Sequence, residues 1–384
     1  MEKIKVLEAG FGLPFGRGGM EVIAWDWYKN LDHDKFAVDF MGEALSDEKY
    51  MKIMSENGSI FFRVSKIKKN KNKLFGFLKK IKSISNIIKE NNYDIVHIHA
   101  TNAFGAFRYY IAAMPYCRHI IVHSHSTGIG TDDIKMDMSG NLRAVLHKIC
   151  RLLMNNKKTV RLSCSEAAAE WMFPKKYKYT VVKNGINSSD FVFDENIRCR
   201  IRRELGTENK FVIGHVGRFS YAKNHVFLID IFEEIHKKEP DSILLLVGSG
   251  SSEEHIKKKV RRARLEDSVI FYGSADNVNE LYTAMDCFVF PSHFEGLGIA
   301  AVEAQAAGLR TFCSDGVPHE ARITELSEYI PLSDSAEKWA EKILACKNGY
   351  ERRNMSEEIK KTGWDIKISA KKLEALYLDL KEKS

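Results

Sequence analysis

The sequence has few of the features that mark secreted, metal-bound or membrane-spanning chains. Its seven cysteines are scattered over 384 residues without a C-x-x-C pair, which argues against a disulfide framework and a structural zinc site. No apolar run approaches the ~18 residues of a membrane-spanning helix. The apolar run at the start is too short for a signal peptide. These absences predict a reducing, cytoplasmic location, with no membrane-spanning segment.

The arrangement of apolar residues predicts an α/β fold. Short β-rich runs alternate with longer helical patterns from end to end, which favours βαβ units with right-handed crossovers. Many of the runs are apolar at consecutive positions, which is typical of strands buried on both faces of a parallel sheet. The predicted strands are Ile4–Glu8, Val38–Met41, Ile95–Ile98, His119–His123, Val212–Val216, Ile243–Val247, Val269–Tyr272, Cys287–Pro291 and Arg310–Cys313.

The length and the repeated pattern predict two Rossmann-like domains. A chain of 384 residues suits two domains of ordinary size. The strand–helix pattern restarts near residue 211, after a connector that contains Asn-Gly and a charged helix. We therefore predict a first domain over 1–187 and a second over 188–360. The remaining segment, 361–384, contains an amphipathic helix by the spacing of its apolar residues.

Ligands of such sheets bind beyond the carboxyl ends of the strands, and two loops of the first domain have unusual composition. Gly18 and Gly19 end a glycine-rich loop before a helix, where backbone N–H groups can approach an anion. The alternative is a plain flexible turn. His123 and His125 follow a strand, but no third ligand with suitable spacing completes a zinc site. One histidine can present a proton or an N–H to a substrate hydroxyl; the alternative is a strand-end pair bonded to backbone.

Two loops of the second domain combine charge with glycine. Arg218 and Lys223 lie in the loop before a predicted helix start near Asn224, and two cations beside a positive dipole end suit a diphosphate. Further along, Glu295 lies among glycines and Glu303 in the first turns of the next helix. Two fixed carboxylates provide the acceptors that sugar hydroxyls need, although the helix dipole alone would favour Glu303.

These residues carry a resemblance to a known family. Glu295 and Glu303 form a Glu-x7-Glu motif, with Gly-Arg-Phe and Lys-Asn upstream at 217–219 and 223–224. The chain resembles, over nearly its whole length, the retaining GT-B glycosyltransferases of family four, and within them the enzymes of bacterial capsule and exopolysaccharide synthesis. The resemblance implies two Rossmann-like parallel-sheet domains facing each other across a cleft. It assigns the acceptor to the first domain and the nucleotide sugar to the second. It also implies that the final helix crosses back onto the first domain.

The resemblance also implies roles for single residues. Arg218 and Lys223 would hold the donor diphosphate and stabilise the leaving nucleotide, and Glu303 would accept from the ribose hydroxyls. Glu295 would contact the donor sugar, and His125 would lie by its anomeric centre. The other donor-binding residues would be Gly18, Gly19, Gly217, Gly273, Gly296, Leu297, Gly298 and Ile299. The acceptor side would include Gly16, Met20 and His123.

The implied activity is transfer of a sugar, with retention of configuration, from a nucleotide-diphosphate sugar to a lipid-linked or saccharide acceptor in surface polysaccharide synthesis. Uridine is the base that the family leads us to expect. No metal or other cofactor is expected. Asp32 and Asp34 match the Asp-x-Asp pattern of metal-dependent transferases, but they should lie at the opposite end of the sheet. A nucleotide-sugar epimerase of the same fold and a non-catalytic nucleotide-sugar-binding scaffold stay open as alternatives.

The excess of positive charge has one concentration. Between Asn57 and Lys89 there are ten Lys or Arg and no Asp or Glu, within a net charge of +8. A basic amphipathic helix over this stretch can lie on an anionic membrane surface, through Lys66–Lys82. The alternative is an ordinary packed helix with a solvated basic face. Nucleic acid is not an expected partner, because aromatic residues do not interleave with the basic ones.

Overall fold

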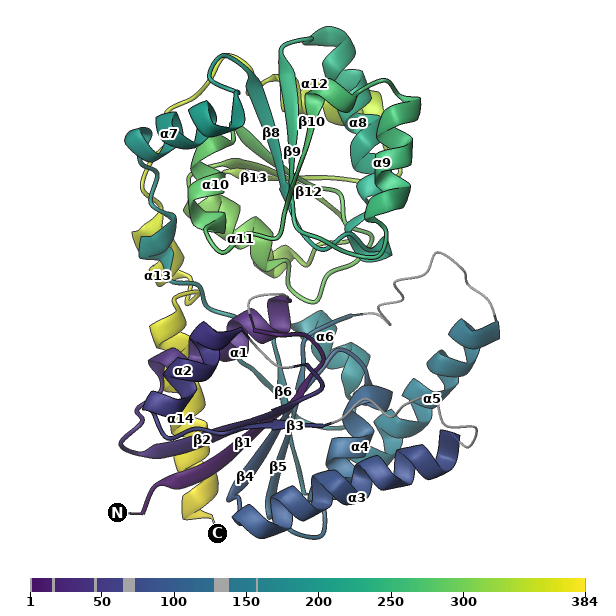
Figure 1. Ribbon diagram of the computed structural model, residues 1–384, viewed down its shortest axis with the longest axis vertical. Coiled ribbons are helices and arrows are strands. Elements are labelled where there is room, and N and C mark those ends of the chain that lie inside the picture. Colours follow the sequence, from purple (N-terminus) through teal and green to yellow (C-terminus); the bar gives the residue numbers. More distant parts are fainter. Residues whose placement is uncertain are drawn as a thin grey trace. The chain divides into compact units, whose positions relative to one another are not determined.

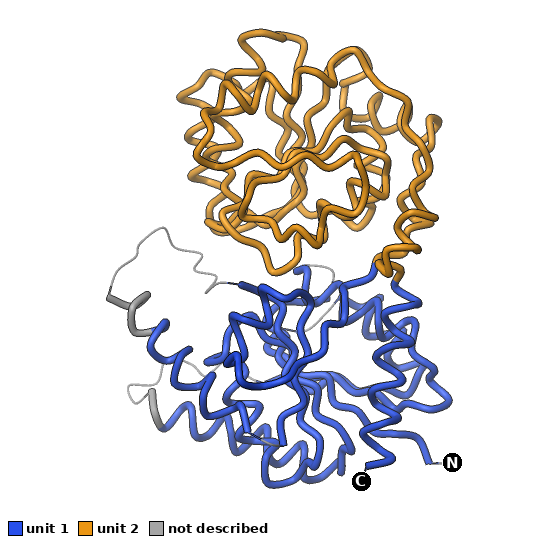
Figure 2. Tube along the Cα trace, turned by 180° about the vertical axis from the view of Figure 1, so that it is seen from behind, with its two compact units in different colours: residues 1–129, 137–185, 366–384 blue, residues 130–136, 186–365 orange. Residues whose placement is uncertain are grey.

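A computed structural model of the protein describes residues 2–15, 18–44, 47–64, 73–127, 138–156 and 158–383. Figure 1 shows its helices and strands. The chain forms two compact units (Figure 2). The first contains the described residues up to Gly185 together with the C-terminal segment from Ile366, and the second contains the described residues from Ile186 to Asp365.

The first unit is built on a parallel sheet of seven described strands, in the order β3-β2-β1-β4-β5-β6-β7. The order reverses direction at β1 and β4, as in doubly wound folds. The strands are β1 (Ile4–Phe11), β2 (Phe36–Gly42), β3 (Phe61–Arg63), β4 (Ile95–Ala100), β5 (His119–Ser124), β6 (Thr159–Ser163) and β7 (Thr180–Val181). The helices are α1 (Gly19–Asn30), α2 (Glu48–Glu56), α3 (Lys73–Asn91), α4 (Ala103–Ala113), α5 (Met138–Met154), α6 (Glu166–Met172) and α14 (Ile366–Glu382).

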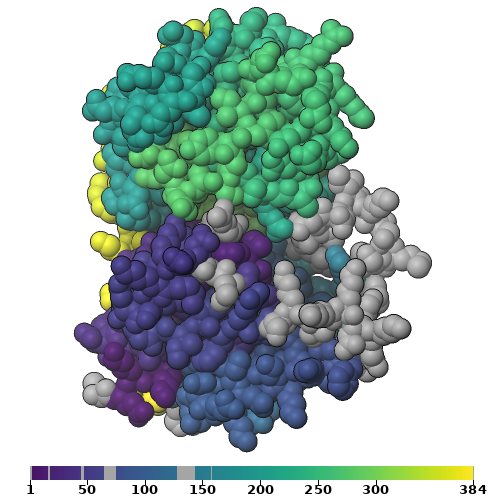
Figure 3. All heavy atoms as spheres, in the orientation of Figure 1, coloured from purple at the N-terminus to yellow at the C-terminus, as the bar shows by residue number. Residues whose placement is uncertain are grey.

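Helices cover both faces of this sheet. Helices α3, α4 and α5 lie side by side on one face, and α1 and α14 lie on the other. The outer side of α3 is exposed, in blue at the lower right of the space-filling view (Figure 3). None of the described helices combines the length and apolarity that a bilayer crossing needs.

Helix α14 belongs to the first unit although the second unit separates it in sequence. Its apolar residues recur at helical spacing and are buried against α1 and the sheet. Trp27 donates its indole N–H to the Ser369 hydroxyl at 2.5 Å, and Glu374 accepts from the backbone N–H of Asp32 at 2.8 Å. These contacts join the last helix to the first one.

The second unit is built on a parallel sheet of six described strands, in the order β10-β9-β8-β11-β12-β13. The strands are β8 (Phe211–Val216), β9 (Ser242–Val247), β10 (Val269–Gly273), β11 (Cys287–Phe290), β12 (Arg310–Ser314) and β13 (Ser327–Ile330). The helices are α7 (Glu195–Leu205), α8 (His225–Lys238), α9 (Glu253–Arg262), α10 (Val278–Ala284), α11 (Ile299–Ala306), α12 (Ala336–Leu344) and α13 (Ser356–Lys361). Four 3-10 turns connect them: Ser188–Phe191, Tyr221–Lys223, Glu266–Ser268 and His319–Ala321.

The α/β class and the two parallel sheets confirm the predicted fold. Each of the nine predicted strands falls on an observed strand, and only Pro291 lies beyond the end of its strand. Strands β3, β6, β7 and β13 were not predicted. Strands β3 and β7 are short, and β6 and β13 contain polar residues. They therefore lack the continuous apolar run that marks a strand buried on both faces.

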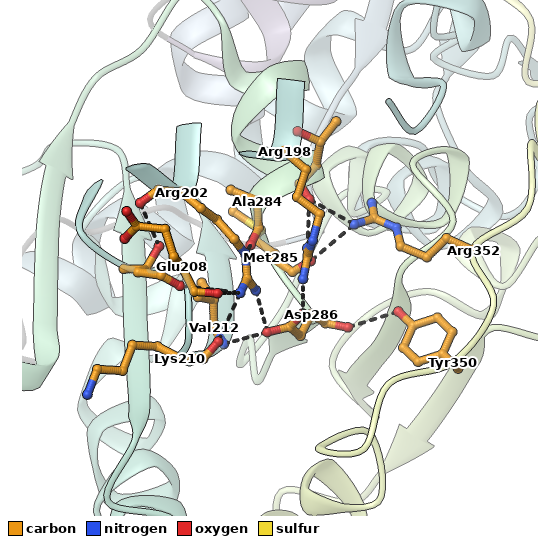
Figure 4. Close-up of polar contacts among 12 residues, drawn as sticks. Arg198, Arg202, Glu208, Lys210, Val212, Ala284, Met285, Asp286, Tyr350 and Arg352 are labelled. Carbon is orange, nitrogen blue, oxygen red and sulfur yellow. Dashed lines mark hydrogen bonds and ion pairs between the residues drawn. The ribbon is translucent and has the colours of Figure 1, made fainter. Parts of the chain in front are cut away.

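A cluster of guanidinium groups around one carboxylate closes the amino-terminal edge of the second sheet (Figure 4). Asp286, just before β11, accepts from Arg198 at 2.5 Å, from Arg202 at 2.5 Å and from the backbone N–H of Val212 at 2.7 Å. Arg352 donates to the carbonyl oxygens that precede Asp286 in the chain. The cluster therefore holds α7, the start of β8 and the segment after α12 together.

We predict that Asp286→Asn lowers the free energy of unfolding of the second unit by roughly 3–5 kcal/mol, because it leaves two largely buried guanidinium groups without a counter-ion. Urea unfolding measures the change. Asp241→Asn is the matched control, since Asp241 forms a solvent-exposed pair with Lys210. Equal effects of the two substitutions would contradict the structural role of the cluster.

Candidate active site

The loops that follow the strands of the second sheet bring the predicted charged residues to one edge. Arg218 and Lys223 follow β8, whereas Glu295 and Glu303 follow β11, its neighbour in the sheet. Parallel strands all end at the same edge, so residues 72 to 85 positions apart in sequence come to that edge. We call this edge, with its loops after β8 to β12, the second-unit loop edge.

An ion pair joins two of these loops. The ammonium of Lys223 lies 2.7 Å from Oε1 of Glu295, and the two side chains are 19% and 11% exposed. The same ammonium lies 4.5 Å from the ring centroid of Phe290, a favourable cation–π position. The backbone N–H of Glu295 donates to the Gly316 carbonyl at 3.1 Å. The Phe290 ring thus supports the Lys223 ammonium, and the Gly316 carbonyl fixes the backbone of Glu295. Partial burial lowers the local dielectric constant, so the attraction between the two charges is stronger than in a surface pair.

The position of Arg218 depends on glycines in the adjoining loops. Gly248 has φ +138°, and a Cβ there would come within 2.2 Å of the Gly217 carbonyl oxygen. At Gly250 a Cβ would meet the Phe219 backbone at 2.3 Å. The loops after β8 and β9 thus pack backbone against backbone. Arg218 lies between Gly217 and Phe219, whose backbones make these close contacts, and its side chain is exposed.

Glu303 lies on the second turn of α11, beside a buried phenol. Tyr282 donates to Oε2 of Glu303 at 3.0 Å. Burial, followed by the charge of Glu303, raises the pKa of Tyr282 well above its usual value, so the phenol stays a donor. Gly298, in the left-handed region at φ +81°, precedes the helix and has no side chain to cap its first turn. The positive end of α11 is thus open to an anionic ligand.

The other predicted donor-binding residues lie on the same edge or in the first unit. Gly217 follows β8, Gly273 ends β10, and Gly296, Leu297, Gly298 and Ile299 lead into α11. In the first unit, Gly18 precedes α1 and Gly19 opens it. Of the predicted acceptor-side residues, Met20 is the second residue of α1. Gly16 lies outside the described residues.

Glu21, which was not a predicted site residue, organises the glycine-rich loop of the first unit. This buried carboxylate accepts from the backbone N–H groups of Gly12 and Leu13, at 3.3 and 3.1 Å. A Cβ on Gly18 would come within 2.5 Å of its other oxygen. A glutamate in the first turn after a glycine-rich loop is a capping signal that the sequence contains.

His125 is linked through a second histidine to a buried carboxylate. It follows β5, and its Nε2 lies 2.9 Å from Nδ1 of His99 on β4. The Nε2 of His99 lies 2.5 Å from Oε2 of Glu8 on β1. Neither Glu8 nor His99 was a predicted site residue. The available signal was the alternation His97-x-His99, which places two histidines on one face of a strand next to the His123-x-His125 strand.

The prediction for His123 requires correction. Its side chain is fully buried, its ring stacks on Trp27, and its Nδ1 lies 3.1 Å from Nε2 of His97. This burial argues against a direct contact with the acceptor, because the alternation of the strand turns His123 toward the face covered by α1 and α14.

Nitrogen atoms of His97, His99 and His123 lie within 4.8 Å of one another, a spacing that a metal ion can use. However, the rings of His97 and His123 are nearly parallel, 4° apart, and are hydrogen-bonded to each other. Zinc needs separate lone pairs directed at one point, so this geometry fits a hydrogen-bond network better. Asp32 and Asp34 precede β2, at the amino edge of the sheet.

Comparison with known proteins identifies the chain. Its residues 198–362 match the family model described as glycosyl transferases group 1, and residues 17–190 match the model described as glycosyltransferase family 4. The chain belongs to the group 1 glycosyltransferases. The two models meet near the point at which the chain passes from the first unit to the second.

Individual relatives support this assignment over most of the glycosyltransferase chain. EpsF of Bacillus subtilis (strain 168), named as a glycosyltransferase, is 28% identical over 94% of this chain and 93% of its own. The UDP-Gal:alpha-D-GlcNAc-diphosphoundecaprenol alpha-1,3-galactosyltransferase of Escherichia coli is 25% identical over 62% of each chain. Anabaena Alr3699/HepE, solved in complex with UDP-glucose, has a TM-score of 0.70 at 18% identity and covers 99% of this chain and 98% of its own. This last likeness supports the GT-B fold.

Two histidines beneath the second-unit loop edge are buried. Burial lowers the pKa of His215 to about 3, although its Nδ1 donates to the Val289 carbonyl at 2.8 Å. Burial, followed by the charge of His215, lowers the pKa of His225 well below its usual value. His225 stacks on Phe219, 4.2 Å between ring centroids, and neither of its nitrogens has a hydrogen-bond partner among the described residues.

We predict that these histidines make the fold acid-sensitive. Each takes up a proton in the unfolded chain below about pH 6.5 but stays neutral when folded, so stability falls as the pH falls, by up to about 1.4 kcal/mol per pH unit and histidine. His225→Phe keeps the ring stack and removes one titrating group. Its melting temperature should therefore fall less than that of the parent between pH 7.5 and 5.5. His255→Gln, at an exposed position, is the control; equal slopes for the parent and His225→Phe would contradict the account.

Proposed function

We propose that this glycosyltransferase transfers a sugar, with retention of configuration and without a metal, from a UDP-sugar to a lipid-linked or saccharide acceptor in surface polysaccharide synthesis. The observation that carries the proposal is the Lys223–Glu295 ion pair, held at the second-unit loop edge beside the open N-terminus of α11.

The residues suit the departure of a nucleoside diphosphate. Negative charge develops on the leaving phosphate, and under the proposal Arg218, Lys223 and the positive end of α11 stabilise it. One preorganised donor of this kind contributes roughly 2.7–4 kcal/mol to transition-state stabilisation. Two fixed cations and a helix end provide the positive charge that a divalent ion supplies in other transferases. This supports catalysis without a metal.

Glu295 and Glu303 suit the neutral parts of the donor. Bound phosphate would share the ammonium of Lys223, and Glu295 would then accept from a hydroxyl of the sugar. Glu303, oriented by Tyr282, would accept from the ribose hydroxyls. A uridine nucleotide is supported by the UDP-glucose complex of the Anabaena protein and by the UDP-Gal in the name of the Escherichia coli relative.

The proposals of retention and of a lipid-linked acceptor rest on the family resemblance and on the same relative. Its name gives an α-linked product and a diphosphoundecaprenol-linked acceptor. Under the proposal, the acceptor hydroxyl attacks the same face of the sugar from which UDP departs. The configuration is then retained without an enzyme nucleophile. A surface polysaccharide assembled on such a lipid would bring the enzyme to the membrane.

A face of the first unit suits this location. Val145, Ile149 and Leu152 recur at helical spacing on the outer side of α5, where they are 52%, 48% and 65% exposed, next to exposed Arg143 and Lys148. On the same face of the sheet, α3 exposes apolar and basic side chains: Phe75, Leu78, Lys79 and Lys82.

Exposed apolar side chains next to exposed cations favour binding to an anionic lipid surface. We propose that this α3–α5 face, defined by the exposed residues just named, docks on the inner membrane surface. In the predicted stretch Lys66–Lys82, residues 66–72 lie outside the described residues, and Lys80 is bonded to Glu43 at 2.5 Å.

We predict that the protein binds UDP in preference to GDP, ADP and TDP in the presence of EDTA, as measured by calorimetric titration. Lys223→Ala and Arg218→Ala should each weaken UDP binding about 10- to 100-fold, since each removes a charged hydrogen bond worth about 1.5–3 kcal/mol. Lys237→Ala, on the exposed side of α8, should bind as the parent does. Absence of nucleotide binding would overturn the proposed function.

Analysis of products separates the proposal from its alternatives. Incubation with a UDP-sugar and a lipid-linked sugar acceptor should give a new glycoside, whose anomeric proton coupling in NMR spectra matches that of the donor sugar. An isomerised UDP-sugar would support an epimerase instead. Tight UDP binding with neither product would support a non-catalytic scaffold.

We predict that Ile149→Asp with Leu152→Asp weakens sedimentation with vesicles of anionic lipid at least tenfold, through loss of apolar insertion and added negative charge. Adding Lys79→Glu and Lys82→Glu to this variant should weaken vesicle binding further. Lys257→Glu, on α9 of the second unit, is the control. Vesicle binding that none of the α3 or α5 variants changes would contradict the membrane-docking face.

A further inference from the structure

His215 is a fully buried histidine near the carboxyl end of β8, beneath the second-unit loop edge. Its Nδ1 lies 2.8 Å from the carbonyl oxygen of Val289 on β11. A carbonyl oxygen only accepts, so Nδ1 carries the proton. Burial lowers the pKa of the ring to about 3, and the charge of Lys223 contributes to this shift. The ring is therefore neutral, and its other nitrogen, Nε2, presents a lone pair.

This lone pair has no obvious use in the structure without a ligand. Nε2 of His215 is buried and has no hydrogen-bond partner among the described residues. A buried acceptor left without a donor is costly, so native proteins rarely keep one without a reason. The nitrogens of His225 also lack partners, but that ring stacks on Phe219, with 17° between the two ring planes. The surroundings of Nε2 of His215 are different.

The Nε2 atom of His215 lies beside the side chain of Lys223. Gly217 has no side chain, and a Cβ there would come within 3.0 Å of this Nε2 and within 3.2 Å of both Cδ and Cε of Lys223. The three atoms therefore border the same small space. The ammonium of Lys223 continues over the ring of Phe290, whose centroid lies 5.6 Å from that of the His215 ring. The lysine side chain thus lies beside two neighbouring rings, and one of them carries an unused acceptor.

The ammonium of Lys223 has three protons to donate. Glu295 accepts one of them at 2.7 Å. Under the proposed function, a bound phosphate shares the ammonium and Glu295 accepts from a hydroxyl of the sugar. The ammonium then needs another acceptor that keeps it in place. A second carboxylate would cancel the positive charge that the phosphate requires, whereas a neutral imidazole nitrogen accepts a hydrogen bond and leaves the charge intact.

We infer that His215 is a positioning residue for Lys223: when a diphosphate is bound, Nε2 of His215 accepts a hydrogen bond from the Lys223 ammonium and holds the cation against the phosphate. The inference rests on the proposed function and deepens it. His215, Lys223, Val289 and Glu295 all belong to the second unit. His215 itself contacts no substrate and acts through the lysine.

NMR of the parent protein tests this hydrogen bond directly. Long-range ¹H–¹⁵N spectra of histidine-labelled protein in EDTA, with His215→Gln to assign the signals, report which ring nitrogen carries the proton and whether the other one accepts. At pH 7.5 and without nucleotide, His215 should be protonated at Nδ1 only. Saturating UDP should shift its Nε2 signal toward that of a hydrogen-bonded nitrogen, and should not do so in Lys223→Ala. A proton on Nε2, or an Nε2 signal that UDP leaves unchanged, would overturn the inference.

A double-mutant cycle tests the consequence for binding, with the Kd for UDP measured by calorimetry. His215→Phe keeps a ring but removes the acceptor, and should weaken binding about 10- to 100-fold, as expected for a lost hydrogen bond to a charged group. His215→Gln offers an amide oxygen and should recover part of this loss. In the Lys223→Ala background, His215→Phe should have no further effect, whereas its effect should persist in the Arg218→Ala background. An equal effect of His215→Phe with and without Lys223 would overturn the inference.

His225→Phe is the matched control, because it replaces another buried, neutral histidine beneath the same loops and keeps the ring stack on Phe219. It should bind UDP as the parent does. If His225→Phe weakened binding as much as His215→Phe, the effect would be one of packing and the inference would be wrong. Absence of UDP binding by the parent would overturn the proposed function instead.

Discussion

Parallel strands impose one constraint on both units: every loop that follows a strand reaches the same edge of its sheet. The register is uninterrupted in the pairs β4–β5, β8–β9 and β8–β11, whose loops bring distant residues together. Lys223 and Glu295 meet in this way, 72 residues apart, as do His99 and His125 on neighbouring strands. The site chemistry therefore follows from strand order, and the helices mainly bury the sheet faces that make this order stable.

Two carboxylates, one half-buried and one buried, show how the position along a strand decides a role. Asp286 precedes β11 and is surrounded by guanidinium groups, and its cluster joins a helix, a strand and a later segment at the amino edge. Glu8 lies on β1, and its partners are imidazoles and a phenol whose chains end at the carboxyl edge. Low local dielectric strengthens both networks and makes each costly to break. The second network ends at two buried ring nitrogens, Nδ1 of His125 and Nε2 of His123, that have no hydrogen-bond partner among the described residues.

The sequence was sufficient for the fold and for bringing Lys223 and Glu295 to one edge of the second sheet. Continuous apolar runs marked the central strands, and the charged residues stood out because each followed such a run. The short strand β7 and the polar strand β13 carried no such signal. Glu8 and Tyr377 could not be linked from sequence, because their contact spans 369 residues and depends on helix α14 returning to the first unit. His123 was assigned to the acceptor side by the family resemblance, and nothing in the sequence showed that its side chain would be buried against Trp27.

The central claim is that the second-unit loop edge binds the nucleotide of the donor. A crystal structure of the protein with UDP, grown in EDTA, tests it most directly. The account predicts the diphosphate against Arg218, Lys223 and the first turn of α11, with a ribose hydroxyl bonded to Glu303 and no metal between protein and phosphate. A nucleotide bound elsewhere on the chain, or phosphates that leave the Lys223–Glu295 pair untouched, would contradict it.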